Sequence, residues 1–188
     1  MGGGIPIWAI VIIAIVVILL IWFISVYNSL VISRNKVRNQ FSQIDVQLKK
    51  RYDLIPNLIE TVKGYAKHET ETLDAIVKAR NSYADAKTDS EKIKNASELS
   101  KGIGRLLAIA ESYPELKANE NFLALQKDLK EVEEKISYAR QFYNDAVMTY
   151  NNKTEVFPSS IAASIGGFKK EVFFEATEKE RENVKVEL

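Results

Sequence analysis

One long apolar run constrains this chain more than any other feature. No charged side chain occurs between Gly2 and Ser33, and residues 5–26 read IPIWAIVIIAIVVILLIWFISV. A helix needs about 20 apolar residues to cross the hydrocarbon core of a bilayer. Trp8 and Trp22 lie near the ends of the run, where interfacial aromatic residues are expected. We predict a transmembrane helix over residues 5–26, preceded by a short extracellular N-terminus, residues 1–4.

A cleaved signal peptide is the competing interpretation of this run. It requires a positively charged region, a shorter apolar run and a small-residue cleavage site. Here no lysine or arginine precedes the run, and the run ends in SVYNSL, which lacks such a site. N-myristoylation is also disfavoured, because Pro6 occupies a position that requires serine or threonine. The sequence therefore favours a retained anchor.

The flanking charges predict the orientation of this anchor. Arg34, Lys36 and Arg38 follow the run, and no acidic residue occurs before Asp45. Because basic residues remain on the cytoplasmic side, we expect the N-terminus outside and the rest of the chain in the cytoplasm. The protein is then a single-pass protein of the cell (inner or cytoplasmic) membrane. We predict that these three basic residues, the two tryptophans and Tyr27 form the membrane interface.

Apolar residues recur with helical spacing along the rest of the chain, and prolines divide it. The first segment continues from the membrane to about residue 52, and the others cover about 55–81, 89–112 and 119–157. Asn119 is a candidate N-cap for the last helix, and Pro158 follows its end. No segment alternates as a strand does. We predict an all-α protein, in which the transmembrane helix continues into an antiparallel, up-and-down four-helix bundle, residues 27–158.

The segment QIDVQLKKRYDLIPNLIETV predicts a joint between the first two helices. We expect the first helix to end near Tyr52, Asp53 to cap the second, and Pro56 to lie in its first turn, where a missing N–H is harmless. If the chain folds back there, Arg51 and Glu69 are candidates for an inter-helix ion pair. The alternative is that these charges reach water at the edge of the apolar stripe.

The C-terminal tail, residues 159–188, has a different composition. It contains the small-residue segment SSIAASIGGF, the apolar segment FKKEVFFEA and the charged segment TEKERENVKVEL. We expect partial docking through Phe168, Phe173 and Phe174, followed by a solvated or disordered end.

Residue types exclude most kinds of catalytic or binding site. The chain has no cysteine, a net charge of +1, and His68 as its one histidine. A zincin needs two histidines and a di-iron bundle two Glu-x-x-His pairs. No phosphate-binding glycine loop or G-x-S-x-G motif is present. We predict no catalytic residue, no cofactor or metal site, and neither nucleic acid nor a small-molecule substrate as a partner.

Several longer segments carry a family resemblance. After the apolar run come YNSLVISRNKVRNQFSQIDVQLKKRYDLIPNLIETVKGYAKHE and LLAIAESYPELKANENFLALQKDLKEVEEKISYARQFYNDAV, then YN, FP, and GF before FFE. The sequence resembles the LemA family of bacterial membrane proteins over nearly its whole length. Phe41 departs from the tryptophan of many relatives. The resemblance implies an outside N-terminus, one span and a cytoplasmic four-helix bundle, with no established enzymatic activity. It also implies a membrane-organising role, since relatives have been linked to magnetosome-vesicle formation.

These features predict a non-enzymatic, membrane-anchored helical scaffold that assembles with itself. Its expected partners are the lipid bilayer, further copies in a homo-oligomer and, as a further candidate, another membrane protein. The alternative is an adaptor or sensor subunit for a membrane protease or an envelope-stress signalling enzyme. An enzyme site built from carboxylates or tyrosines inside the bundle is disfavoured.

Overall fold

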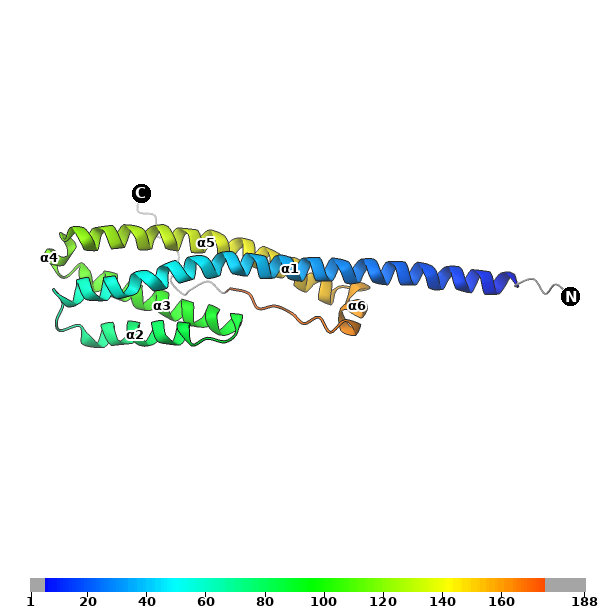
Figure 1. Ribbon diagram of the computed structural model, residues 1–188, viewed down its shortest axis with the longest axis horizontal. Coiled ribbons are helices and arrows are strands. Elements are labelled where there is room, and N and C mark those ends of the chain that lie inside the picture. The colour runs from blue at the N-terminus through cyan, green and yellow to red at the C-terminus, as the bar shows by residue number, and fades with distance from the viewer. Residues whose placement is uncertain (1–5, 175–188) are drawn as a thin grey trace, which may run out of the picture. The chain divides into compact units, whose positions relative to one another are not determined.

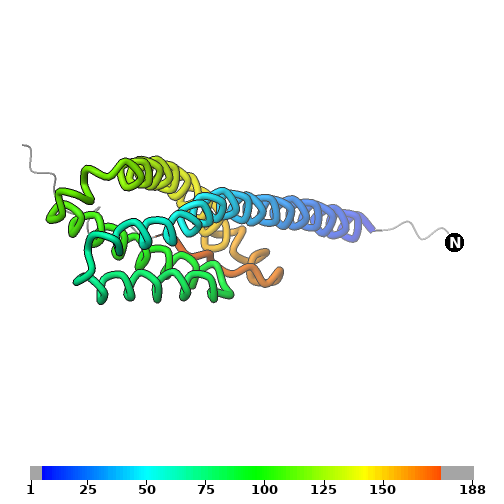
Figure 2. Tube along the Cα trace, turned by 60° about the vertical axis from the view of Figure 1, so that its left-hand side comes forward, coloured from blue at the N-terminus to red at the C-terminus, as the bar shows by residue number. Residues whose placement is uncertain are grey.

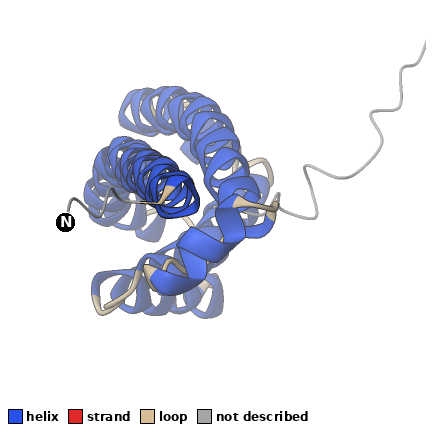
Figure 3. Ribbon diagram, turned by 90° about the vertical axis from the view of Figure 1, so that its right-hand side faces the viewer, coloured by secondary structure: helices blue, strands red, loops and turns tan. Residues whose placement is uncertain are grey.

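The computed structural model describes residues 6–174, and every regular element in that range is a helix (Figure 1). The helices are α1 (Ile7–Lys63), α2 (Thr70–Ala84), α3 (Asp89–Ala110), α4 (Pro114–Lys117), α5 (Glu120–Glu155) and α6 (Ser159–Ile165). Figure 3 shows them joined by short loops, with no strand in the described range. The predicted all-α class is confirmed. The predicted terminus, residues 1–4, and the charged end of the tail lie outside the described residues.

The described chain divides into two compact units. The first unit contains residues 6–39 and 144–172, and the second contains residues 40–143 and 173–174. α1 and α5 each contribute one part to the first unit and one part to the second.

The side chains of α1 are exposed in its N-terminal part, whereas one face of the helix is buried in its C-terminal part. Every side chain from Ile10 to Ile21 is exposed, and this part is long and apolar enough to cross a membrane. The same helix continues without a break and buries a stripe at three- and four-residue spacings: Leu30, Val37, Phe41, Ile44, Leu48, Ile55, Leu58 and Val62. The predicted continuation of the apolar helix into the following segment is confirmed.

The predicted helix joint at Pro56 is wrong. Pro56 lies inside α1, which ends only at Lys63. The chain reverses over residues 64–69, where the N–H groups of Tyr65 and Ala66 both donate to the carbonyl oxygen of Val62. Asp53 does not begin a helix; its carboxylate binds Lys49 one turn earlier, at 2.5 Å. The expectation failed because Arg80 of α2 donates to the backbone carbonyl that the missing N–H of Pro56 leaves without its helical donor.

Five helices contribute to an apolar core cluster of the second unit. α2 and α3 form an antiparallel hairpin beside the C-terminal part of α1, and the first part of α5 runs beside α1 as well (Figures 1 and 2). The core cluster contains Ile55, Leu58, Val62, Ala66, Leu73, Ile76, Leu99, Ile103, Leu106, Ala110, Leu116, Phe122 and Leu129. These residues lie on α1, α2, α3, α4 and α5 and on the loop after α1, so each element depends on the others for burial of its apolar face.

Local signals at two helix starts agree with the structure. The side-chain oxygen of Asn119 accepts the N–H of Phe122 at 3.0 Å, which confirms the predicted N-cap of α5. Thr88 and Glu91 form a capping box at the start of α3. Backbone N–H groups of residues 87 and 88 lower the pKa of the exposed Glu91 carboxyl. Strong capping explains why the predicted starts of α3 and α5 match the observed ones.

Candidate functional site

The residues predicted for the membrane interface lie along α1 but make different contacts. Trp8 is exposed near the start of the helix, and Trp22 is half-buried. Tyr27 packs edge-on against Phe168, with ring centroids 5.4 Å apart. The guanidinium of Arg34 lies 4.9 Å from the centre of the same Phe168 ring. The structure therefore brings Tyr27 and Arg34 together through a residue of the tail.

Lys36 and Arg38 differ from Arg34 in their exposure. Both lie on the exposed side of α1, whereas Arg34 is half-buried. Lys153 of α5 also contributes to the first unit, because its ammonium donates to the hydroxyls of Ser29 and Ser33 at 2.8 and 2.7 Å. Sequence reasoning identified the three basic residues of α1 but missed Lys153, which lies far away in the chain.

Residues 167–172, which we term the docked segment, bind α5 through backbone contacts. The phenol of Tyr150 donates to the carbonyl oxygen of Lys169 at 2.8 Å. The Asn151 amide both donates to the carbonyl oxygen of Glu171 and accepts its N–H, each at 2.9 Å. Burial, followed by the nearby Glu171 charge, raises the pKa of Tyr150. A fully buried tyrosine and a buried asparagine of α5 thus hold a segment that is itself neither helix nor strand.

Two of the three tail residues predicted to dock are buried, and the third is exposed. Phe168 and Phe174 are buried, while Phe173 is exposed. The Phe174 ring lies in the second unit, where the guanidinium of Arg140 is 4.4 Å from its centre. The composition of the tail identified its aromatic residues. It did not indicate that Tyr150 and Asn151 bind the backbone of Lys169 and Glu171, which lie between Phe168 and Phe173.

Of the three predicted joint residues, Tyr52 and Pro56 belong to a contact between α1 and α2 in place of a turn, whereas Asp53 does not. Pro56 has no N–H, so the carbonyl oxygen of Tyr52, one turn earlier, lacks its usual helical donor. Arg80 of α2 donates to that carbonyl at 3.4 Å through Nε. Its guanidinium also lies 3.9 Å from the centre of the Tyr52 ring. Arg80 thus compensates for the proline, while Asp53 faces its own helix partner, Lys49.

A double-mutant cycle tests this compensation. We expect Arg80→Ala to lower the free energy of unfolding by about 1–2 kcal/mol, because a cation–π contact and a hydrogen bond are lost. In a Pro56→Ala background the loss is smaller by about 0.5–1 kcal/mol, since the new N–H at position 56 binds the Tyr52 carbonyl. Urea unfolding of the full chain in mild detergent measures both values. Lys78→Ala, an exposed change on α2, is the control, and strictly additive effects would contradict the compensation.

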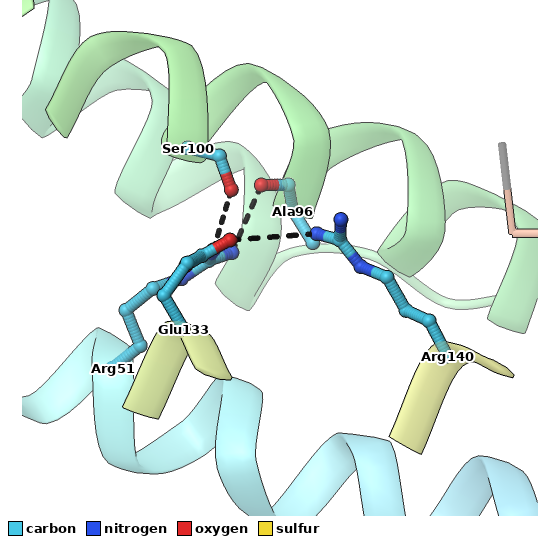
Figure 4. A network of polar contacts seen from close by, with 5 residues as sticks. All are labelled: Arg51, Ala96, Ser100, Glu133 and Arg140. Atoms are coloured by element: carbon cyan, nitrogen blue, oxygen red, sulfur yellow. Dashed lines mark hydrogen bonds and ion pairs between the residues drawn. The ribbon is translucent and has the colours of Figure 1, made fainter. Parts of the chain in front are cut away.

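A network of two buried arginines connects three helices of the second unit (Figure 4). The Arg51 side chain on α1 is 1% exposed and binds the Ala96 carbonyl at 2.9 Å and the Ser100 hydroxyl at 2.5 Å, both on α3. It also binds the Glu133 carboxylate on α5 at 3.0 Å. Arg140 lies 3.9 Å from the other oxygen of Glu133. One carboxylate therefore faces two guanidinium groups.

The predicted pair of Arg51 with Glu69 is wrong. α1 runs on for twelve residues beyond Arg51, about 18 Å, before the chain reverses. Glu69 therefore lies beyond the far end of α1, where it accepts the hydroxyl of Tyr113 at 3.1 Å. That carboxylate raises the pKa of the Tyr113 phenol. Glu133 of α5, whose side chain is 45% exposed, is the actual partner.

A second polar cluster joins α1 to the α2–α3 hairpin. Asp45 accepts the hydroxyl of Tyr83 at 3.1 Å and pairs with Lys92 at 3.1 Å. Burial raises the pKa of the Tyr83 phenol well above its ordinary value, and the Asp45 charge raises it further. The tyrosine therefore stays protonated and acts as a hydrogen-bond donor. Both clusters place charged groups of α1 against neighbours in the same unit.

The described residues contain no group of three or more histidine, cysteine, aspartate or glutamate side chains arranged to hold a metal ion. His68 lies exposed in the loop between α1 and α2. In the arginine network, the Arg51 guanidinium donates to the Ser100 hydroxyl, the Ala96 carbonyl and the Glu133 carboxylate. These hydrogen bonds and ion pairs hold α1, α3 and α5 in a fixed orientation within the second unit.

The sequence matches a known protein family. The model for the LemA family matches residues 40–188. A protein named LemA from Metamycoplasma hominis is 26% identical over 158 residues, which cover 84% of this chain and 72% of the relative. The family match includes all of the second unit as well as the docked segment.

Proteins named for magnetosomes match a shorter region. Magnetosome protein MamQ 2 of Paramagnetospirillum magneticum is 34% identical over 73 residues, or 39% of this chain, and magnetosome protein MamQ of Magnetospirillum gryphiswaldense is 32% identical over 72 residues, or 38%. These matches cover 27% and 26% of the two relatives. The chain thus spans about a quarter of the length of these magnetosome proteins. None of these names specifies an enzymatic reaction.

Proposed function

This chain belongs to the LemA family, and from that premise we propose that it is a non-enzymatic scaffold, anchored in the cytoplasmic membrane by the N-terminal part of α1. In this proposal the scaffold assembles with itself and organises the membrane around it. The matches to proteins named magnetosome proteins support the membrane-organising part.

The observation that carries the proposal is the exposure of α1. Its apolar residues from Ile10 to Ile21 are exposed without exception, yet the same unbroken helix buries a stripe from Leu30 onward. A large contiguous apolar surface on a soluble protein requires cover. A bilayer supplies that cover over the length of a span. The continuous helix then couples the anchor directly to the helical units.

The basic residues after the run support the orientation with the N-terminus outside. Arg34, Lys36 and Arg38 precede the first acidic residue of the chain. In the second unit, Tyr138 and Phe142 are both exposed one turn apart on α5. Exposed aromatic side chains are common in protein interfaces, so this pair supports self-association.

Thiol labelling tests the anchor and its orientation, because the natural chain has no cysteine. We expect Gly3→Cys to react with a membrane-impermeant maleimide in intact cells, and Val46→Cys to react only after lysis. The cysteine-free chain is the control. Deletion of residues 2–26 should move the protein from the carbonate-washed membrane fraction to the soluble fraction. Labelling of Val46→Cys in intact cells, or a truncated chain that stays in membranes, would contradict the proposal.

Mass photometry of the full chain in mild detergent tests self-assembly. We expect oligomers, and we expect Tyr138→Ser with Phe142→Ser to shift the distribution toward monomers. Lys135→Ser, an exposed change on the same helix, is the control. Monomers alone for the natural chain would count against the scaffold. Recovery of one membrane protease or signalling enzyme at a fixed ratio would instead favour an adaptor.

A further inference from the structure

The segment from Val156 to Ile165, which we term the α6 corner, turns its large apolar side chains outward. Phe157 is 76% and Ile165 70% exposed, and Val156 and Ile161 are exposed as well. The residues of α6 that are buried are Ala162 and Ala163. A helix at the surface of a soluble protein does the reverse, with its large apolar residues inward. The outward face of the corner therefore needs a different explanation.

The corner also lacks charge. No charged side chain occurs from Val156 to Phe168. After the apolar run that ends before Arg34, this is the longest uncharged stretch of the chain. An exposed segment without charge is poorly suited to water, but it suits the boundary between lipid headgroups and acyl chains.

The chain directly after α6 lies against the end of the apolar part of α1. A Cβ added at Gly166 would lie 3.0 Å from Cε2 of Tyr27. The Phe168 ring packs on the same tyrosine, with centroids 5.4 Å apart. Figure 1 shows α6 beside α1 in this region, within the first unit. The corner thus lies at the level of Tyr27, one residue beyond the predicted span 5–26.

That level coincides with the lipid headgroups. A bilayer has a hydrocarbon core of about 30 Å and a total thickness of about 40–45 Å, which leaves roughly 5–8 Å of headgroup region on each side. At 1.5 Å per residue, about three to five residues of α1 after position 26 cross this region. Tyr27 falls within it, and so does any segment packed beside Tyr27.

We propose that the α6 corner is a second membrane contact, which inserts Phe157, Ile161 and Ile165 into the interface of the leaflet where the span ends. The occupant of the exposed face is lipid, because the chain directly after α6 packs on Tyr27, at the end of the exposed apolar part of α1. This contact rests on the membrane anchor proposed above. Two contacts on one unit restrict both the tilt and the rotation of α1 in the bilayer, as interfacial side chains do for other spans.

Spin labels at single cysteines test this contact in the full chain. The natural chain has no cysteine, so Ile161→Cys and Ile165→Cys each carry one nitroxide. The protein is reconstituted into vesicles of phosphatidylethanolamine and phosphatidylglycerol. Collisions with oxygen report lipid exposure, and collisions with a water-soluble nickel chelate report exposure to water. Ile18→Cys in the apolar run and Val46→Cys on an exposed position of the second unit are the lipid and water references.

We expect labels at Ile161→Cys and Ile165→Cys to be more accessible to oxygen than to the nickel chelate, at a depth between the two references. Phe157→Ser added to Ile165→Cys should move that label toward water. Water-like values at both positions, with Ile18→Cys deep in lipid, overturn the contact but leave the anchor intact. Low accessibility to both reagents also overturns it, because protein then covers the face. A water-like Ile18→Cys overturns the anchor itself.

Discussion

Replacement of Arg51 by alanine is expected to lower the free energy of unfolding by about 3 kcal/mol. Arg51 is the largest of the fully buried side chains in the described chain, and it contacts both α3 and α5. Truncation leaves a cavity and removes three hydrogen bonds at once. Urea unfolding of the full chain in mild detergent, followed by circular dichroism, measures the change.

Two further substitutions separate the charge of Arg51 from its volume. Arg51→Met retains most of the volume without a charge, so we expect a loss of about 1 kcal/mol or less. Glu133→Gln leaves the buried guanidinium with only neutral partners, and we expect a loss of about 1–2 kcal/mol; the cost is moderate because Glu133 is 45% exposed. Arg105→Ala, at an exposed position of α3, is the matched control. A loss below about 1 kcal/mol for Arg51→Ala would show that the network does not stabilise the unit.

Replacement of Asn151 by alanine is expected to release the docked segment. The change removes two hydrogen bonds to the backbone of Glu171, both at 2.9 Å, and leaves those backbone groups unpaired. We expect a loss of about 2–3 kcal/mol from the local free energy of opening. Hydrogen exchange of residues 167–172 in the full chain should accelerate by roughly 30-fold or more, the equivalent of 2 kcal/mol.

The neighbouring residue supplies a close control for this second prediction. Asn152 has the same side chain on the same helix but is exposed, so Asn152→Ala should leave exchange of the docked segment nearly unchanged. Equal acceleration in the two variants would mean that helix propensity, and not the paired amide, controls the segment. Unchanged exchange in Asn151→Ala would show that Phe168 and Tyr150 hold the segment without it.

Local signals predicted the helices far better than the contacts between them. Asn119 defines a helix start through a hydrogen bond within a few residues, so sequence reasoning found the start of α5. The start of α3 was predicted from apolar periodicity alone, and the structure adds the capping box at Thr88. The prediction at Pro56 was wrong because the outcome there depends on a residue far away in the sequence. A proline usually ends or kinks a helix, but Arg80 of α2 binds the carbonyl that the proline leaves free. Nothing near Pro56 in the sequence identifies Arg80.

For the charged residues, too, the sequence predicted local features better than contacts between distant residues. The position of Arg51 within an apolar stripe left two possibilities, an inter-helix ion pair or a charge that reaches water, and the structure shows the side chain buried. Its partner could not be predicted, because the choice between Glu69 and Glu133 depends on where the chain reverses. With the reversal at residues 64–69, Glu133 of α5 lies beside Arg51 and Glu69 lies beyond the end of α1.

The sequence by itself determined that this is a helical protein with one long apolar segment and an unbroken helix leading from it. Periodicity, capping and the absence of charge are properties of neighbouring residues, so they can be read along the chain. Only the tertiary structure decided where α1 ends, which carboxylate faces Arg51, how Asn151 binds the tail, and that α6 leaves its isoleucines exposed. Those outcomes depend on contacts between residues far apart in sequence, where several pairings satisfy the same local pattern and packing of the whole unit selects one.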